Sequence, residues 1–367
     1  MAKTYRAGVI GFAHMHINEL MRQFGAQPSV QWVACADTVP TVPEKVVARF
    51  TRDWNKQHAH EVIGIPKVYD DYREMLEKES FDIVLFCPEN ARHGEVGTAI
   101  AKKGAHLVTE KPMAARLADA QAMARAAEAA GVKLMVNWPS TWQPAVRKMK
   151  ELLDGGAIGR LLEVKVRQGS LGPLAHGSTH PGIDGRAVEI TDEEKGATWW
   201  YHHADGGGAL LDYCCYGACL ARWLVGKAAE AATGYTANLA SKYGDAEDNA
   251  VITVRFADAM ALLESSWSTV DHAQPTGPIV YGERGTMSLE KGAVRLVQGR
   301  GAEPQIVQPD ALPTGRATLA EEFIHHLETK EPLHPTLDPR FNLEAQAILE
   351  AGIVSAESGR LERVEQI

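Results

Sequence analysis

Residues 5–20 read YRAGVIGFAHMHINEL, and this stretch decides how the first half of the chain folds. An apolar run reaches Gly11, and the residues after it have the apolar spacing of a helix near 17–24. The dinucleotide-binding pattern G-x-G-x-x-G requires glycines at 11, 13 and 16, whereas this chain has Gly11, Ala13 and His16. Taken alone, the stretch is either a relaxed cofactor loop or an ordinary turn between a strand and a helix.

Strands and helices alternate through the first 136 residues. Short apolar strands are predicted at 5–10, 31–36, 83–87, 106–109 and 133–136. Helical patterns follow them near 17–24, 44–57, 73–79, 94–103 and 115–130. This order predicts a doubly wound parallel sheet, an α/β fold in which ligands bind at the carboxyl ends of the strands.

The pattern changes after Gly155 and Gly156. Residues 159–172 alternate with period two, and further alternating runs occupy 250–256, 261–267, 279–281, 286–289 and 293–297. No long helices separate those later runs, so a large, mostly antiparallel sheet is predicted. Helices are expected at 209–225, 319–329 and 339–359. A chain of 367 residues is long enough for two domains, and we place the boundary at 140.

Composition excludes several classes of protein. The net charge of −9 leaves no basic surplus for a nucleic acid or an anionic membrane. No apolar run approaches the roughly 20 residues of a membrane helix, and the first residues lack a signal-peptide core, so we expect a cytoplasmic protein. Cys215 and Cys219, and likewise His176 and His180, are spaced like metal ligands, but neither pair has an evident partner, and no metal is predicted.

Asp37 ends the second predicted strand, 26 residues after Gly11. An acidic residue at this position accepts hydrogen bonds from the adenosine ribose and repels a 2′-phosphate. No arginine lies between Asp37 and Arg49 to receive such a phosphate. The sequence therefore favours NAD over NADP.

Three further motifs occur in order along the chain. CPENARHGEV (87–96) and TEKPMA (109–114) each follow a predicted strand, and GGGALLDYCCYGACLARWLVG (206–226) begins an apolar helix. Together they resemble the glucose-fructose oxidoreductase / inositol dehydrogenase / MocA (Gfo/Idh/MocA) family. The resemblance implies a Rossmann domain that binds NAD, residues 1–140, and an α/β domain for substrate binding and oligomerisation, residues 141–367, built on a large open sheet.

The resemblance also implies a set of cofactor-binding residues. They are Gly11, Phe12, Ala13, His14, Met15, Asp37, Pro88, Asn90, His93, Glu110, Lys111 and Trp142. The family often has N-R-R-F-x-P after its sixth strand, whereas this chain reads VNWPSTWQP (136–144). We therefore expect Trp142 to supply a stacking contact in place of the missing arginines.

Lys111, Asp212 and Tyr216 are the predicted catalytic residues. Lys111 matches the family's catalytic lysine and Asp212 its conserved acid, while Tyr216 stands where most members have histidine. Asp212 and Tyr216 are four apart and so share a helix face. A phenol needs help to act as a base at neutral pH, and we expect Lys111 to lower the pKa of Tyr216. The alternative is that Asp212 only stabilises the helix N-terminus and Tyr216 only fills the core.

The resemblance implies hydride transfer between nicotinamide and a hydroxyl-bearing carbon of a sugar, polyol or cyclitol. Substrate contacts are assigned to Lys111, Gln168, Tyr201, His203, Asp212 and Tyr216. Two alternatives stay open: a redox-neutral enzyme that retains NAD and oxidises its substrate transiently, and a dinucleotide-binding regulator without turnover. The uncovered sheet of the second domain predicts a homodimer or homotetramer.

Overall fold

The alternating strands and helices of the first half form a six-stranded sheet in the computed structural model, which describes residues 3–271 and 277–367. The strand order is β3-β2-β1-β4-β5-β6, and every pairing is parallel, as predicted. The strands are β1 (Tyr5–Phe12), β2 (Val30–Ala36), β3 (Val68–Tyr69), β4 (Ile83–Cys87), β5 (His106–Glu110) and β6 (Leu134–Asn137). The two-residue β3 was not predicted because it is too short to show a period.

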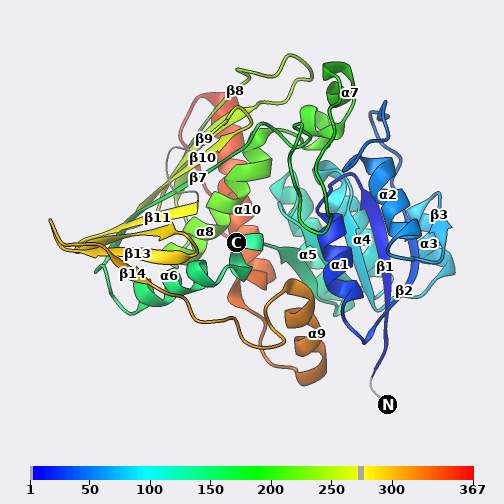
Figure 1. Ribbon diagram of the computed structural model, residues 1–367, viewed down its shortest axis with the longest axis horizontal. Helices are drawn as coiled ribbons and strands as arrows, with labels where there is room; N and C mark the ends of the chain where they lie inside the picture. The colour runs from blue at the N-terminus through cyan, green and yellow to red at the C-terminus, as the bar shows by residue number, and fades with distance from the viewer. Residues whose placement is uncertain (1–2, 272–276) are drawn as a thin grey trace.

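Helices cover both faces of this sheet, as Figure 1 shows at its blue and cyan end. They are α1 (Ile17–Gly25), α2 (Arg52–Glu61), α3 (Tyr72–Lys78), α4 (His93–Lys102) and α5 (Leu117–Ala130). The helix predicted at 44–57 was wrong in its first half. Phe50 has φ of 79°, which no α-helix accommodates, and Thr51 is extended, so α2 begins only at Arg52.

The second sheet runs in the order β14-β13-β12-β11-β7-β10-β9-β8-β15. Its strands are β7 (Leu161–Gly169), β8 (Ala231–Ala237), β9 (Asn249–Arg255), β10 (Met260–Ser266), β11 (Gly277–Gly282), β12 (Gly285–Glu290), β13 (Ala293–Gln298), β14 (Gln305–Val307) and β15 (Glu362–Arg363). Only the pairing of β7 with β10 is parallel among those described, so the mostly antiparallel sheet is confirmed. β8, β14 and β15 were missed.

Helices cover one face of the second sheet and join it to the first. They are α6 (Pro144–Asp154), which was not predicted, α8 (Cys215–Val225), α9 (Leu319–Thr329) and α10 (Pro339–Ser358). Figure 1 shows α8 and α10 between the two sheets. α10 packs on α8 and β8 and also on α5, while α9 packs on α1. One hydrophobic core therefore continues from the parallel sheet into the antiparallel one.

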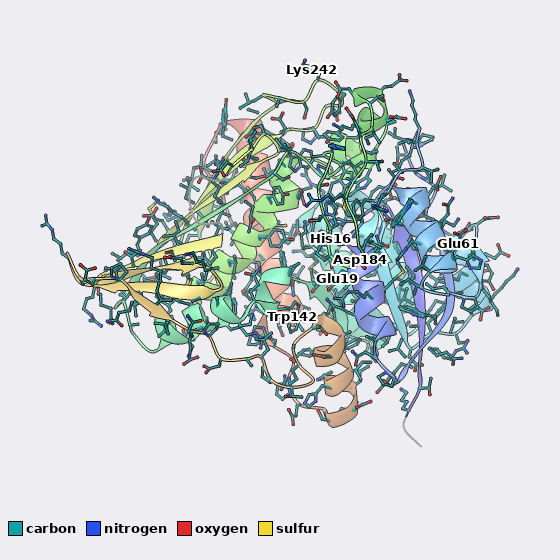
Figure 2. All side chains as sticks on the ribbon, in the orientation of Figure 1. His16, Glu19, Glu61, Trp142, Asp184 and Lys242 are labelled. Atoms are coloured by element: carbon teal, nitrogen blue, oxygen red, sulfur yellow. The ribbon has the colours of Figure 1, made fainter. Side chains whose placement is uncertain are left out.

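Residues 170–205, here called the crossing segment, connect β7 to the helical region and pass over α1 (Figure 1). The segment contains α7 (Asp192–Gly196) and the short turns η3 (Trp199–Tyr201) and η4 (His203–Asp205). At Gly182 its backbone lies so close to α1 that a Cβ would stand 2.4 Å from the Glu19 nitrogen. Figure 2 shows Asp184 of this segment near His16 and Glu19. No helix in the described ranges is long and apolar enough to span a bilayer.

Candidate active site

The turn after β1 is formed by Gly11 through His16. Gly11 has φ of 81°, and a Cβ there would lie 2.5 Å from the Pro88 nitrogen, so only glycine allows the ends of β1 and β4 to meet. Ala13 accepts a hydrogen bond at its carbonyl from Trp199 Nε1 (2.8 Å). The His14 ring packs edge-on against Trp200, with ring centroids 4.8 Å apart. The crossing segment therefore covers this turn.

Asp37 lies at the end of β2, as predicted, and one of its oxygens is saturated. Oδ1 accepts hydrogen bonds from the backbone of Phe12 (3.2 Å) and Thr38 (2.8 Å) and from Arg52 Nη1 (2.7 Å). An arginine therefore does stand beside Asp37, although none was expected there. Arg52 lies 15 residues further along the chain, and the turn into α2 brings it back to the strand edge.

The ends of β4 and β5 carry four more of the predicted cofactor-binding residues. Asn90 Nδ2 donates to the Gly206 carbonyl (2.8 Å), and His93 Nδ1 lies 3.2 Å from the Met113 carbonyl. Both side chains thus connect the strand end to a neighbouring loop. Glu110 Oε1 accepts from Asn137 Nδ2 (2.6 Å). Pro88 is buried against Gly11.

Trp142 reaches this region only indirectly. Its Nε1 donates to Asn137 Oδ1 (3.0 Å), and its ring lies 5.3 Å from the guanidinium of Arg147. Figure 2 shows Trp142 beyond the end of the parallel sheet, above α9. Hydrogen bonds thus connect Trp142 to Glu110 through Asn137, and its expected stacking contact with the cofactor stays a prediction.

Lys111, Asp212 and Tyr216 meet in one buried cluster. Lys111 Nζ donates to Asp212 Oδ1 (2.7 Å) and to the Asp212 carbonyl (3.0 Å), and it lies 4.8 Å from the centroid of the Tyr216 ring. Asp212 Oδ2 accepts from Trp267 Nε1 (3.0 Å). Asp212 sits in a π-helical turn, η5 (Leu210–Cys214), that precedes α8. Such turns are rare and are frequent at functional sites.

The charges in this cluster differ from the expectation for Tyr216. Burial alone would lower the pKa of Lys111, but the Asp212 carboxylate outweighs it and holds that pKa well above its usual value. Burial raises the pKa of Tyr216, and the nearby ammonium only partly offsets this effect. Lys111 therefore does lower the pKa of Tyr216, as expected, but burial outweighs it and leaves that pKa raised, which favours the neutral phenol over the phenolate at neutral pH.

Three histidines adjoin the cluster, of which only His14 was predicted as a site residue. The His16 ring centroid lies 4.5 Å from that of His14 and 6.0 Å from that of His180. His16 Nδ1 lies 3.4 Å from Glu110 Oε2. His180 belongs to the crossing segment, and its Nε2 lies 3.0 Å from the Pro173 carbonyl, which fixes the proton on Nε2. Burial lowers the pKa of His180 to about 4.

The remaining predicted substrate residues are placed differently from one another. Side chains two residues apart on a strand lie on the same face, so Gln168 shares the face of β7 that carries the buried Val164 and Val166 and is covered by the helices. Tyr201 is buried behind Trp267, with ring centroids 5.4 Å apart. His203 is exposed, lies 3.4 Å from Glu247 and borders a cavity of about 530 Å³ whose lining includes neither Lys111 nor Asp212.

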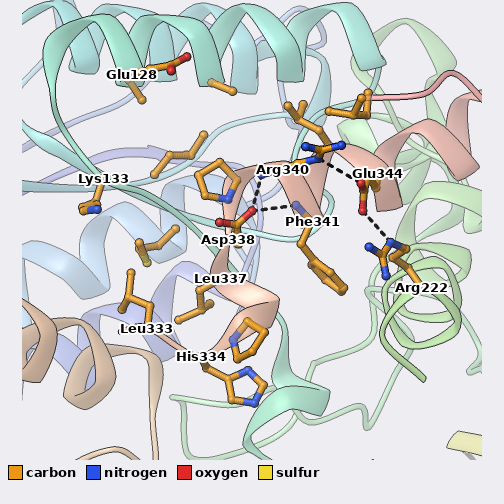
Figure 3. Close-up of a pocket in the computed structure, with 18 of the residues that line it drawn as sticks. Glu128, Lys133, Arg222, Leu333, His334, Leu337, Asp338, Arg340, Phe341 and Glu344 are labelled. Carbon is orange, nitrogen blue, oxygen red and sulfur yellow. Dashed lines mark hydrogen bonds and ion pairs between the residues drawn. The ribbon is translucent and has the colours of Figure 1, made fainter. Parts of the chain in front are cut away.

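A larger groove of about 1480 Å³ lies between α5, α8 and α10, and its lining includes none of Lys111, Asp212 and Tyr216. Figure 3 shows it lined by His334, Leu337, Asp338, Phe341 and other side chains. Some of its charged residues are paired, for example Arg222 with Glu344 (2.6 Å). No group of three or more possible metal ligands is found in the described residues.

The carboxyl edge of the parallel sheet fits a dinucleotide. Polar atoms there are buried and, among the described residues, make no hydrogen bond: His14 Nε2, Asn90 Oδ1, His93 Nε2 and Glu110 Oε2, of which the last has only the 3.4 Å contact with His16 Nδ1. Such atoms are costly unless a ligand satisfies them. They line the end of β4 and β5 and the turn after β1, which is where doubly wound sheets hold dinucleotides.

Two family models match the chain. Residues 5–138 match the oxidoreductase family with an NAD-binding Rossmann fold, and residues 146–288 match the GFO/IDH/MocA C-terminal domain. D-apiose dehydrogenase of Paraburkholderia graminis is 39% identical over 101 residues, 28% of this chain and 27% of that protein. Myo-inositol 2-dehydrogenase of Thermotoga maritima is 31% identical over 125 residues, 34% of this chain and 37% of that protein. Each match thus spans less than half of the relative.

Solved structures resemble the whole chain. Levoglucosan dehydrogenase in complex with NADH and levoglucosan has a TM-score of 0.74 and 19% identity, covering 99% of this chain and 100% of that one. Aldose-aldose oxidoreductase of Caulobacter crescentus has a TM-score of 0.75 and 21% identity, covering 98% and 100%. At this identity the likeness shows the fold alone. The two family models and the geometry of the strand ends agree, and the chain belongs to the Gfo/Idh/MocA family of NAD-binding oxidoreductases.

Proposed function

We propose that this protein is a dehydrogenase that transfers a hydride between NAD and a hydroxyl-bearing carbon of a sugar, polyol or cyclitol. The observation that carries the proposal is the buried Lys111–Asp212 pair beside Tyr216, at the carboxyl end of β5. Relatives named for apiose, inositol and levoglucosan support the substrate class. Their matches are partial, so the substrate of this chain is part of the proposal.

Cofactor binding is assigned to the residues around the strand ends. The turn of Gly11, Phe12, Ala13, His14 and Met15 would hold the pyrophosphate, and Asp37 the adenosine ribose. The residues assigned near the nicotinamide half are Pro88, Asn90, His93, Glu110 and Lys111, with Trp142 acting through Asn137. NAD, when bound, supplies the hydride acceptor.

Lys111 polarises the reacting oxygen in this proposal. Two of its three N–H groups are used by Asp212, so one remains for the substrate oxygen. Asp212 fixes the ammonium and is itself held by Trp267. Because the Tyr216 phenol is neutral, it is ready to donate a proton to a carbonyl oxygen, and it must lose that proton before it acts as the base for alcohol oxidation.

His180 gives the site a second proton acceptor. Its Nε2 hydrogen is engaged by the Pro173 carbonyl, so Nδ1 carries a lone pair. The ring is close enough to Asp212 and Lys111 for both charges to act on it. We assign His180 to the substrate site together with Gln168 and Tyr201, and we keep His203 as the most exposed of the proposed contacts.

The direct test is a panel of inositols, D-apiose, levoglucosan and common aldoses with NAD or NADP, followed at the nicotinamide absorbance. Reduction of NAD by at least one member, lost in Lys111→Met, supports the proposal. The matched control is Lys150→Met, since Lys150 pairs with Asp154 on the surface of α6. Equal turnover of Lys111→Met and wild type would refute the assignment of Lys111.

A redox-neutral enzyme with retained NAD is the second candidate, and the crossing segment favours it. Trp199 and Trp200 cover the turn after β1, and Gly182 lies on α1. Cofactor exchange therefore requires this segment to move. NAD that copurifies and stays bound through gel filtration, with no NADH released during turnover, would identify this second activity. No contact in the structure favours a regulator without turnover.

Assembly and domain division complete the proposal. We propose a division at residue 140 and a homodimer or homotetramer packed through the second sheet. Large apolar side chains are exposed on its strands, including Tyr235 at 70% and Met260 at 47%. Light scattering at micromolar concentration tests the assembly, and a monomer would contradict it.

A further inference from the structure

Arg52 is buried between two carboxylates at the adenosine end of the proposed cofactor site. Its Nη1 donates to Asp37 Oδ1 (2.7 Å), and its Nη2 donates to Glu89 Oε1. The two acids come from the ends of β2 and β4, whereas Arg52 begins α2. All three side chains are less than a tenth exposed.

Thr38 completes this arrangement and fixes its geometry. Its hydroxyl donates to Glu89 Oε2 (3.2 Å), and Arg52 Nη1 lies 3.2 Å from both its hydroxyl and its carbonyl. Both oxygens of Glu89 are therefore engaged, and so are both terminal nitrogens of the guanidinium. Among the carboxylate oxygens of Asp37 and Glu89, Asp37 Oδ2 alone has no hydrogen bond in the described part of the chain.

The charges of this group bear on the choice between NAD and NADP. A free arginine beside Asp37 would be a receptor for the 2′-phosphate of NADP. Here one cation meets two anions, so the group has a net charge of −1 if all three are ionised. A buried charge of this sign opposes a phosphate dianion, while Asp37 Oδ2 still accepts a ribose hydroxyl.

We infer that Glu89 determines cofactor specificity, because it engages Arg52 and so withholds the guanidinium from a 2′-phosphate. The inference deepens the proposed NAD preference and rests on it. Asp37 alone repels the phosphate in the usual scheme for such folds. In this chain the second acid is required as well, since Arg52 would otherwise cancel the charge of Asp37.

The test measures the affinities of NADH and NADPH by fluorescence titration, without any substrate. Wild type should prefer NADH. Glu89→Gln keeps the size of the side chain but removes its charge and leaves one acceptor oxygen, so its hold on the guanidinium weakens and its NH2 can only donate to the Thr38 hydroxyl; it should strengthen NADPH binding by about tenfold or more while NADH binding changes little. Asp37→Ser/Glu89→Gln should reverse the preference. Arg52→Gln should act in the opposite direction and weaken NADPH further, which a merely structural role would not produce.

Glu44→Gln is the matched control. Glu44 also bonds to Arg52, but to its backbone N–H (2.8 Å) and not to its guanidinium, so this variant removes a nearby charge while the guanidinium stays engaged, and it should change the NADPH to NADH ratio much less than Glu89→Gln does. Folding of each variant is checked by its thermal unfolding midpoint. If Glu89→Gln does not fold, Arg52→Gln decides: it should weaken NADPH binding and leave NADH binding nearly unchanged.

Each outcome has one meaning. A folded Glu89→Gln protein with the wild-type NADPH to NADH ratio overturns the inference and leaves the proposed function intact, and so does an Arg52→Gln protein with that ratio when Glu89→Gln cannot be obtained. A wild-type protein that binds neither dinucleotide overturns both. A Glu44→Gln protein that gains NADPH as strongly as Glu89→Gln also overturns the inference, because the effect would then not depend on the guanidinium.

Discussion

The Lys111–Asp212 pair gives a stability prediction whose size follows from the structure. Lys111 Nζ is 1% exposed and donates to Asp212 Oδ1 at 2.7 Å. In Lys111→Met the carboxylate stays buried, and Trp267 Nε1 becomes its one side-chain donor. Leaving one partner of a buried pair uncompensated costs about 3–5 kcal/mol. Since folded proteins are stable by roughly 5–15 kcal/mol, this loss is a large fraction of the total.

The double variant separates charge from packing. Lys111→Met/Asp212→Leu leaves no unpaired charge, so it should be less destabilised than Lys111→Met by about 2 kcal/mol or more. Chemical unfolding followed by tryptophan fluorescence measures both variants against wild type. Lys150→Met is the control, because its partner Asp154 is exposed and the pair contributes about 0–1 kcal/mol. A loss for Lys111→Met no larger than that of the control would refute the reasoning, as would additive losses in the double variant.

Three further predictions concern proton transfer, acid stability and cofactor release. Tyr216→Phe should keep the fold and lower turnover by about 10²–10⁴-fold. Because the pKa of the phenol is raised, the rate of alcohol oxidation by wild type should increase with pH between 7 and 9. A rate that does not change over this pH range would exclude the phenol as the base. Burial lowers the pKa of His93 to about 4, below its unfolded value near 6.5, so the unfolded chain binds the extra proton first and the His93 contribution to stability should fall between pH 6.5 and 4 by about 1.4 kcal/mol per pH unit. Because other buried histidines act in the same direction, the measured quantity is the difference in slope between wild type and His93→Gln in urea unfolding, and equal slopes would contradict the prediction. Gly182→Leu should push the crossing segment away from α1 and increase the rate of NADH release, measured by stopped-flow fluorescence. Gly177→Leu is the control, because a Cβ at Gly177 meets open space, and it should not change that rate. Equal release rates in the two variants would count against a covering role for the segment.

Local patterns in the sequence were sufficient for the two sheets, and the family resemblance selected Lys111, Asp212 and Tyr216, which the structure places together. Five strands of the parallel sheet are short apolar runs, and a parallel sheet buries such runs on both faces, so composition alone identifies them. In the sequence, Lys111 directly follows a predicted strand, and Asp212 follows the three glycines at 206–208. The structure brings Lys111 Nζ to within 2.7 Å of Asp212 Oδ1. Three of the missed strands, β3, β14 and β15, are two or three residues long and have no period to detect. β8 is seven residues long, but its sequence AATGYTA does not alternate between apolar and polar residues.

Tertiary structure alone decided the surroundings of these residues. Arg52 approaches Asp37 because Phe50 interrupts the predicted helix and redirects the chain, and no spacing rule indicates that bend. His180 and Trp199 reach the active-site region from a segment of about 35 residues without sheet structure, whose path depends on where Gly182 fits against α1. The state of Tyr216 likewise depends on burial, which outweighs a lysine in contact with its ring. Sequence reports which groups are available, but the pKa of a group and its partners are set by distance and solvent exclusion, and these exist only once the chain has folded.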